Sequence, residues 1–352
     1  MVGEWVEPVA SVVMAQNVAD DLTIRAATDD DRAAVIELCR ASLGWKQGDP
    51  NEGFFAWKHD ENPFGTSPAW VAVASDGSLA GLRVFLRWRF RAPDGEVIDA
   101  VRAVDTATHP DWQGKGIFTR LTLGALDELA DQGLDVVFNT PNDQSRPGYL
   151  KMGWSQVGRV PVGLRVRSVS SFRRIAGARA AAEKWSQDSD VAMDAAALLG
   201  EHSAPSGELT ALLERLEPAK GIHTDVSADY LRWRYSFAPL GYRALPLGDR
   251  LDDGVVAFRV RRRGTATELT VCDVLAPRGA PVGRAIGHLL RRSGADYAIR
   301  TIDSGLLDPA AVRTGFVPAP QLGPILTWRP VTRPTVPSIG DLALTLGDVE
   351  LF

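Results

Sequence analysis

The residues that point most directly to chemistry form a glycine-rich turn at positions 113–116, between an expected strand and an expected helix. The first N–H groups of a helix have no intrahelical partners, and the helix dipole favours an anion in front of them. Because Gly114 and Gly116 lack a Cβ, a phosphate can approach the backbone closely, and Lys115 adds positive charge. The turn therefore predicts a phosphate site. An ordinary turn remains the alternative, since the sequence here matches neither the Walker loop nor the full dinucleotide fingerprint.

The turn lies within a run of elements typical of a mixed α/β domain. Apolar periodicity and turn residues predict strands over residues 22–25, 70–74, 79–91, 97–108 and 135–140. The same signals predict helices over residues 33–43, 117–129 and 145–152, and a short amphipathic segment that contains Phe54, Phe55 and Trp57. The resulting order is β-α-α-β-β-β-α-β-α, with a hairpin meander in the middle.

Composition limits the classes of protein to which the chain can belong. Its 352 residues predict about two domains, because a single core stops growing at roughly 250–300 residues. Apolar residues make up 45% of the chain and charged residues 24%, which excludes a wholly disordered or fibrous protein. The net charge of −5 argues against a nucleic-acid partner. No apolar run is long enough to cross a bilayer, so no membrane partner is expected.

Cysteine usage and the N-terminus indicate the compartment. The two cysteines, Cys39 and Cys272, cannot build a disulfide framework, and no cluster of His, Cys, Asp and Glu has metal-ligand spacing. Residues 1–21 contain no Lys or Arg ahead of their apolar stretch, so we interpret them as a loose extension rather than an export signal. We therefore expect a cytoplasmic protein that holds no metal.

Two motifs in the first half of the chain resemble those of the GNAT acyltransferases. Residues 109–118 are similar to motif A, Gln/Arg-x-x-Gly-x-Gly/Ala, with Phe118 in place of the final Gly or Ala. Residues 142–154 are similar to Asn-x-x-Ala-x-x-x-Tyr-x-Lys-x-Gly-Phe, with Ser145 and Trp154 as mild departures. The motifs occur in the family's order and strand–helix layout, and the resemblance covers about residues 22–165.

The resemblance implies a site for acetyl-CoA or another acyl-CoA. The family pairs pantetheine with the strand before motif A and holds the pyrophosphate at the turn, and it uses a tyrosine to protonate the leaving thiolate. Tyr149 would be this acid. The alternative is that Tyr149 is a helix residue that only packs against its neighbours. The implied cofactor-binding residues are Thr106, Ala107, Thr108, Gln113, Gly114, Lys115, Gly116, Ile117, Phe118 and Asn142.

A base is also expected if the acceptor is an alkyl amine. Only about one such amine in a thousand is neutral at pH 7, and deprotonation costs roughly 4 kcal/mol. A positioned carboxylate can meet that demand, directly or through water. Asp105 is the strongest candidate, although its carboxylate could instead be held by turn or sheet-edge donors. Glu52 and His109 are weaker candidates, and His109 is expected to shape the turn before Pro110.

The second half of the chain repeats features of the first. Trp233 follows Trp57 by 176 positions, and at this offset Lys58 aligns with Arg234. Residues 294–301 align with 133–140 at an offset of 161, so an internal repeat is expected. The second copy lacks the glycine-rich motif, and residues 309–311 read Pro-Ala-Ala where Tyr149 would recur. We interpret this second copy as a degenerate, non-catalytic domain that forms one wall of the acceptor cleft.

These observations predict two GNAT-like domains, each a mixed, mostly antiparallel sheet flanked by helices. The expected division is an extension (1–21), a catalytic domain (22–165), a linker with helical segments (166–220), a degenerate domain (221–330) and a tail (331–352). The linker is basic at its start, which would suit an acidic membrane surface, but a solvated linker helix is the favoured interpretation.

The expected function is N-acyl transfer, most simply of acetyl, to a primary amine of a small molecule by direct attack. One alternative is a non-catalytic acyl-CoA-binding or sensing protein, and another is an aminoacyl-tRNA-dependent transferase of similar tandem fold. A pure interaction scaffold would show no CoA binding at all. Tyr149 and Asp105 favour catalysis, whereas the acceptor and the oligomeric state leave no signal in the sequence.

Overall fold

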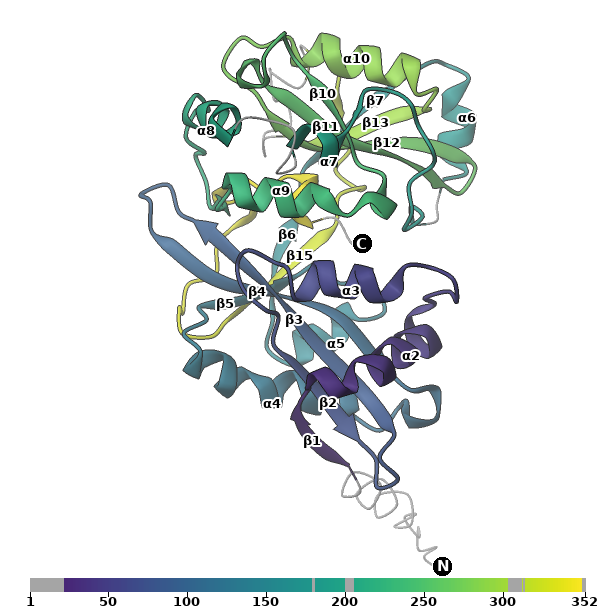
Figure 1. Ribbon diagram of the computed structural model, residues 1–352, viewed down its shortest axis with the longest axis vertical. Coiled ribbons are helices and arrows are strands. Elements are labelled where there is room, and N and C mark those ends of the chain that lie inside the picture. Colours follow the sequence, from purple (N-terminus) through teal and green to yellow (C-terminus); the bar gives the residue numbers. More distant parts are fainter. Residues whose placement is uncertain (1–21, 179–180, 200–205, 303–311, 313, 350–352) are drawn as a thin grey trace, which may run out of the picture.

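The computed structural model describes residues 22–178, 181–199, 206–302, 312 and 314–349. The N-terminal extension and the Pro-Ala-Ala stretch at 309–311 lie outside the described residues. Two mixed, mostly antiparallel sheets are stacked along the long axis of the molecule, and helices cover their faces (Figure 1). The predicted fold class is confirmed. Among the described helices, none is both long and apolar enough to cross a membrane.

The first sheet has the strand order β1-β2-β3-β4-β5-β15-β6, and β9 pairs with the far end of β3. Its one parallel pairing among the described strands joins β4 to β5. The predicted strands over 79–91 and 97–108 are confirmed at both ends. The strand bounds are β1 Thr23–Ala26, β2 Ala69–Val73, β3 Leu79–Arg91, β4 Val97–Thr108, β5 Val136–Asn139, β6 Ser155–Arg159, β9 His223–Thr224 and β15 Ile325–Pro330.

Helices bury apolar stripes on both faces of this sheet. Helix α4 (Ile117–Asp131) presents Ile117, Leu121, Ala125 and Leu129 at four-residue spacing to one face. Helix α2 (Arg32–Leu43) packs Val35, Ile36, Leu38 and Cys39 against the opposite face. Helix α3 (Asn51–His59) lies on the same side as α2, and α5 (Arg146–Lys151) follows β5.

The second sheet has the order β14-β7-β13-β12-β11-β10-β8. Strand β7 belongs to this sheet although it precedes the linker, and β15 returns from the second half to lie between β5 and β6 of the first sheet. Each sheet therefore contains a strand from the other half of the chain. The strand bounds are β7 Val162–Val166, β8 Met193–Asp194, β10 Arg243–Pro246, β11 Val255–Arg263, β12 Ala266–Leu275, β13 Tyr297–Thr301 and β14 Val317–Pro318.

The helices of the second half cover this sheet and meet the first domain. Helix α10 lies on the outer face, while α9 lies between the two sheets and faces α3 (Figure 1). The bounds are α6 Ser171–Ala176, α7 Ala195–Leu199, α8 Ser206–Glu214, α9 Ala228–Ser236, α10 Val282–Arg292 and α12 Leu346–Val349. Short 3-10 turns occupy Asp29–Asp31, Pro110–Trp112, Ala238–Leu240, Leu251–Asp253 and Ile339–Asp341.

Two tryptophans join α3 to α9 in a reciprocal way. The rings of Trp57 and Trp233 stack with centroids 5.4 Å apart. The indole N–H of Trp57 donates to the carbonyl of Trp233 at 2.7 Å, and that of Trp233 donates to the carbonyl of Trp57 at 2.6 Å. These are the two tryptophans that the sequence aligned at an offset of 176. Both are buried in the one core cluster that extends through both sheets.

We expect Trp57→Phe and Trp233→Phe each to lower the free energy of unfolding by about 1–3 kcal/mol, since each loses a buried hydrogen bond and part of a stacked ring. Because the two residues form one contact, the double variant should lose about 1 kcal/mol less than the sum. Urea unfolding of the full chain measures the free energy of unfolding of the two single variants and of the double variant. The control Trp112→Phe, on a half-buried surface turn, should change stability by less than about 0.5 kcal/mol. Strict additivity would contradict the reciprocal contact.

Candidate active site

A cleft opens where two parallel strands of the first sheet separate. β4 and β5 pair from Ala100–Val136 to Arg102–Phe138, and then their pairing ends although β4 continues to Thr108. The next part of β4 pairs only with β3, so its other edge faces the gap. The cleft has a volume of about 630 Å³. It is lined by both separated strand ends and by the segment that leads into α5.

A bulge in β4 shapes the edge of this cleft. The partners in β3 change from Leu82–Ala107 to Val84–Val104, so two residues of β4, Asp105 and Thr106, lie opposite the single residue Arg83. Asp105 has a φ of +40°, a left-handed conformation that is unusual for a residue with a side chain. Bulges and such backbone outliers are frequent next to active sites.

The Asp105 carboxylate is held by two consecutive residues of α3. Its Oδ2 accepts a hydrogen bond from Lys58 Nζ at 2.7 Å and lies 2.8 Å from His59 Nε2. Burial alone would raise the pKa of Asp105, but the Lys58 charge and the His59 hydrogen bond outweigh burial and hold it well below its usual range. Burial lowers the pKa of His59, so the neutral imidazole is favoured, with Nε2–H donating to the carboxylate.

Tyr149, which lines the cleft, contacts a buried arginine that sequence reasoning missed. Arg83 is fully buried, and its Nη1 donates to the Tyr149 hydroxyl at 2.8 Å and to the hydroxyl of Thr106. Its Nε and Nη2 have no hydrogen-bond partner among the described atoms. The strand 79–91 contains three further arginines, Arg87, Arg89 and Arg91, so its sequence does not single out Arg83. A buried guanidinium therefore lies directly beside the tyrosine oxygen.

The glycine-rich turn begins α4 at the open end of the cleft. Gly114 and Gly116 have φ values of +76° and +73°, and a Cβ at either position would meet no atom within 4 Å. Lys115 lies over the ring of Trp112, with Nζ 4.4 Å from its centroid. The turn is exposed, whereas the following Ile117 is buried in the core beneath α4. This open, glycine-lined helix start fits a phosphate group.

The structure brings most of the expected site residues together. The cleft lining includes Asp105, Thr106, Thr108, Phe118, Asn142 and Tyr149. Ala107 packs beneath α2 instead, so only its backbone is available to a ligand. The exposed turn beside the cleft consists of Gln113, Gly114, Lys115 and Gly116. The ring of Phe118 packs edge-on against Tyr149, with centroids 5.3 Å apart.

Asn142, His109 and Glu52 have different surroundings. Asn142 accepts hydrogen bonds from the backbone N–H groups of Gln144 and Ser145 and so shapes the start of α5. His109 accepts a backbone hydrogen bond from Asp111, as expected for a turn-shaping residue. Glu52 is exposed in the first turn of α3 and is not part of the cleft lining.

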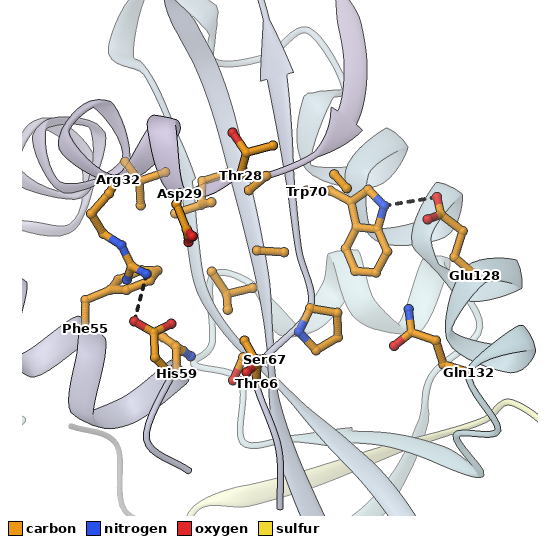
Figure 2. Close-up of a pocket in the computed structure, with 18 residues that line it drawn as sticks. Thr28, Asp29, Arg32, Phe55, His59, Thr66, Ser67, Trp70, Glu128 and Gln132 are labelled. Atoms are coloured by element: carbon orange, nitrogen blue, oxygen red, sulfur yellow. Dashed lines mark hydrogen bonds and ion pairs between the residues drawn. The ribbon is translucent and has the colours of Figure 1, made fainter.

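A second cavity approaches the same buried carboxylate from another direction. Figure 2 shows this cavity of about 230 Å³, with Arg32, Phe55 and His59 on one side and Trp70, Glu128 and Gln132 on the other. His59 thus lies between this cavity and Asp105. None of the sequence motifs lines it, so we assign the site to the cleft. Among the described residues, no group of three or more His, Cys, Asp and Glu could hold a metal ion.

Comparison with known proteins agrees with the resemblance that the motifs indicated. Residues 23–157 match the family model of the acetyltransferase (GNAT) domain. Residues 23–157 of this chain are therefore a GNAT acetyltransferase domain. The GNAT domain comprises α2 to α5 and the strands from β1 to β5. No curated protein matches the chain.

Solved structures share the fold over most of the chain. A conserved Enterococcus faecalis protein, described as a probable N-acyltransferase, has a TM-score of 0.62 at 12% identity. A GCN5-related N-acetyltransferase from Anabaena variabilis has a TM-score of 0.59 at 13% identity, and Eis1 from Mycobacterium abscessus has 0.53 at 18%. Each similarity covers 88% of this chain and 73% of the other. At these identities the comparison shows the fold alone.

We expect Lys58→Met to lower the free energy of unfolding by about 3–5 kcal/mol at pH 7, because it leaves the buried Asp105 carboxylate without its cation. The folded-state pKa of Asp105 is lowered, so the pair stabilises the protein above the unfolded pKa, near 3.9, and less as pH falls below it. Urea unfolding between pH 7 and pH 3 should therefore show the difference from wild type shrinking with acid.

The matched control for this variant is Arg89→Met, which removes a solvent-exposed ion pair with Asp99 on neighbouring strands. Exposed pairs contribute about 0–1 kcal/mol, so this control should lose little at any pH. A loss for Lys58→Met as small as that of the control would contradict the role of the buried pair.

Proposed function

We propose that the cleft transfers an acyl group, in the first instance acetyl, from acyl-CoA to a primary amine of a small molecule. The observation that carries this proposal is the separation of β4 from β5, which opens an unpaired strand edge beside Tyr149. Such an edge can accept the amide groups of pantetheine as a further strand would. The open glycine-rich turn suits the phosphates of acyl-CoA, and the cleft has a volume that suits a ligand of the size of acyl-CoA.

Bound acetyl-CoA would supply a thioester carbonyl that a neutral amine can attack directly. Tyr149 is proposed to donate its proton to the departing thiolate, and its location on the cleft wall supports this role. Arg83 would stabilise the tyrosine oxygen once that proton has left, since its Nη1 already donates to this oxygen. The two residues would therefore act as one unit.

Asp105 is proposed to attract the acceptor amine and to assist its deprotonation. A carboxylate with a lowered pKa is a weak proton acceptor, but it is a permanent anion that attracts an alkylammonium group. Deprotonation of the acceptor by Asp105 would therefore proceed through ordered water rather than by lasting transfer to the carboxylate. Lys58 and His59 keep this anion in place at the cleft edge.

We also infer that the second sheet is a degenerate copy of the first. The parallel pairing of β12 with β13 places Glu268 opposite Tyr297, which is 161 positions after Val136 and matches the offset in the sequence. Tyr235, aligned with His59, donates to Asp273 as His59 does to Asp105. Helix α12 packs on β12, with Gly347 against the Asp273 carboxylate, so a helix of the described chain covers this position, whereas Asp105 lines an open cleft.

Acetyl-CoA titration tests the site. We expect calorimetry to show roughly micromolar binding by the wild type and at least about tenfold weaker binding by Gly116→Trp, because the new side chain would occupy the open space before α4. Gly95→Trp is the matched control, since Gly95 has a φ of +90° and equally open surroundings in the hairpin turn at the opposite end of β4. Equal losses in both variants, or no binding by the wild type, would overturn the acyl-CoA site.

Turnover separates an enzyme from a sensor. With a panel of primary amines and detection of released thiol, we expect Tyr149→Phe to lower kcat by about 10²–10³-fold and to leave the KM for acetyl-CoA nearly unchanged. Unchanged kcat would remove Tyr149 as the acid. Tight acetyl-CoA binding without turnover on any amine would favour the non-catalytic acyl-CoA-binding alternative.

A further inference from the structure

A lysine from the segment between the two sheets is enclosed by aromatic rings next to the cleft. Lys184 Nζ lies 3.8 Å from the ring centroid of Phe54, 4.4 Å from that of Trp45 and 4.6 Å from that of Trp185. We call these three rings the aromatic cage. Ring faces attract a cation, so the cage holds the lysine terminus in place.

The cage supplies no hydrogen bond to the amine. Lys184 Nζ is buried and has no hydrogen-bond partner among the described atoms. Burial lowers the pKa of Lys184 to about 8, an effect that the Asp105 charge opposes and the Lys58 charge reinforces. At pH 7 about a tenth of such an amine is neutral, compared with roughly one in 2,500 for an ordinary lysine. Neutral amine is the form that attacks an acyl group.

The location of Lys184 brings this amine near the acyl-transfer chemistry. It lines a cavity of about 450 Å³, whose wall includes Leu43 and Trp45. The same two residues line the acyl-CoA cleft, so the two hollows share a wall. A lysine stem is flexible, and rotation about its four-carbon chain moves the amine by several ångströms.

We propose that Lys184 is an acyl acceptor within the protein itself, so that the enzyme acetylates its own side chain at the wall of the acceptor site. The neutral Nζ forms a bond to the thioester carbonyl carbon and the carbon–sulfur bond breaks. The departing thiolate takes the Tyr149 proton, the nitrogen loses a proton to water, and Tyr149 regains a proton from that water. The products are N-acetyl-Lys184 and free CoA. The modified side chain has no charge, so it no longer attracts the cage as a cation.

Other groups near this cavity explain why Lys184 is singled out. Lys58 is committed to its ion pair with Asp105, and Lys46, on the same cavity, is exposed and lies outside the cage. The charged and titratable groups that face or influence the Lys184 amine are Cys39, Asp49, Lys58, Asp105, Lys46 and Glu183.

The test is incubation of the full chain with acetyl-CoA and no added amine, followed by intact-mass measurement and peptide mapping. We expect one acetyl group per chain, at Lys184, at a rate per molecule independent of protein concentration. Lys184→Arg should abolish this label and Lys46→Arg should retain it. Tyr149→Phe should slow labelling by at least about tenfold. Separately, sulfo-NHS-acetate should label Lys184 with a midpoint near pH 8, below the value of roughly 10.4 for an ordinary lysine.

The inference rests on the proposed function, and the outcomes distinguish the two. If added amines are acetylated and Lys184 is not, self-acetylation is wrong while the proposed function stands. If acetyl-CoA neither binds nor transfers to any amine, both fail. If the midpoint of Lys184 labelling by the CoA-free reagent lies near the roughly 10.4 of an ordinary lysine rather than near pH 8, the claim of an activated amine is wrong. Labelling that rises with protein concentration would also overturn the intramolecular route.

Discussion

The buried Asp105 carboxylate is the constraint on which the other parts of the site depend. A charge with so little exposure must be paired, and both of its partners come from one turn of α3. The residue just before them, Trp57, makes the reciprocal contact with the second domain. Three consecutive side chains of α3 therefore connect the edge of the acyl-transfer cleft to the domain interface, and a shift of this helix would affect both.

The cleft itself results from an interruption of regular pairing. β4 gains one residue relative to β3 at Asp105 and Thr106, and it separates from β5 a few residues earlier. A regular sheet would have satisfied these backbone groups internally and would have left no edge for a ligand. The buried charge of Arg83 lies on the strand opposite the bulge and joins Thr106 to Tyr149. Asp105 and the strand edge proposed to bind pantetheine are thus neighbouring positions of one irregular strand.

The second domain packs closely against the first. Its α9 faces α3, and the aromatic cage around Lys184 combines rings from the first domain with Trp185 from the connecting segment. Arg102 of β4 also donates to the backbone carbonyls of Asp348 and Val349, so the end of the described chain is held against the first sheet. The exchange of β7 and β15 between the sheets strengthens this union, because neither sheet is complete from one half of the chain.

The sequence by itself determined the local features of this protein. The hairpin strands, the glycine-rich turn before α4 and the Tyr149 motif were all readable, because helix and strand periods and turn residues act over a few positions. Only the tertiary structure decided that Lys58 and His59 pair with Asp105, that Arg83 reaches Tyr149, and that β15 inserts beside β5. These contacts join residues far apart in the chain, and they depend on strand register and on the cost of burying unpaired charge, which no short sequence pattern records.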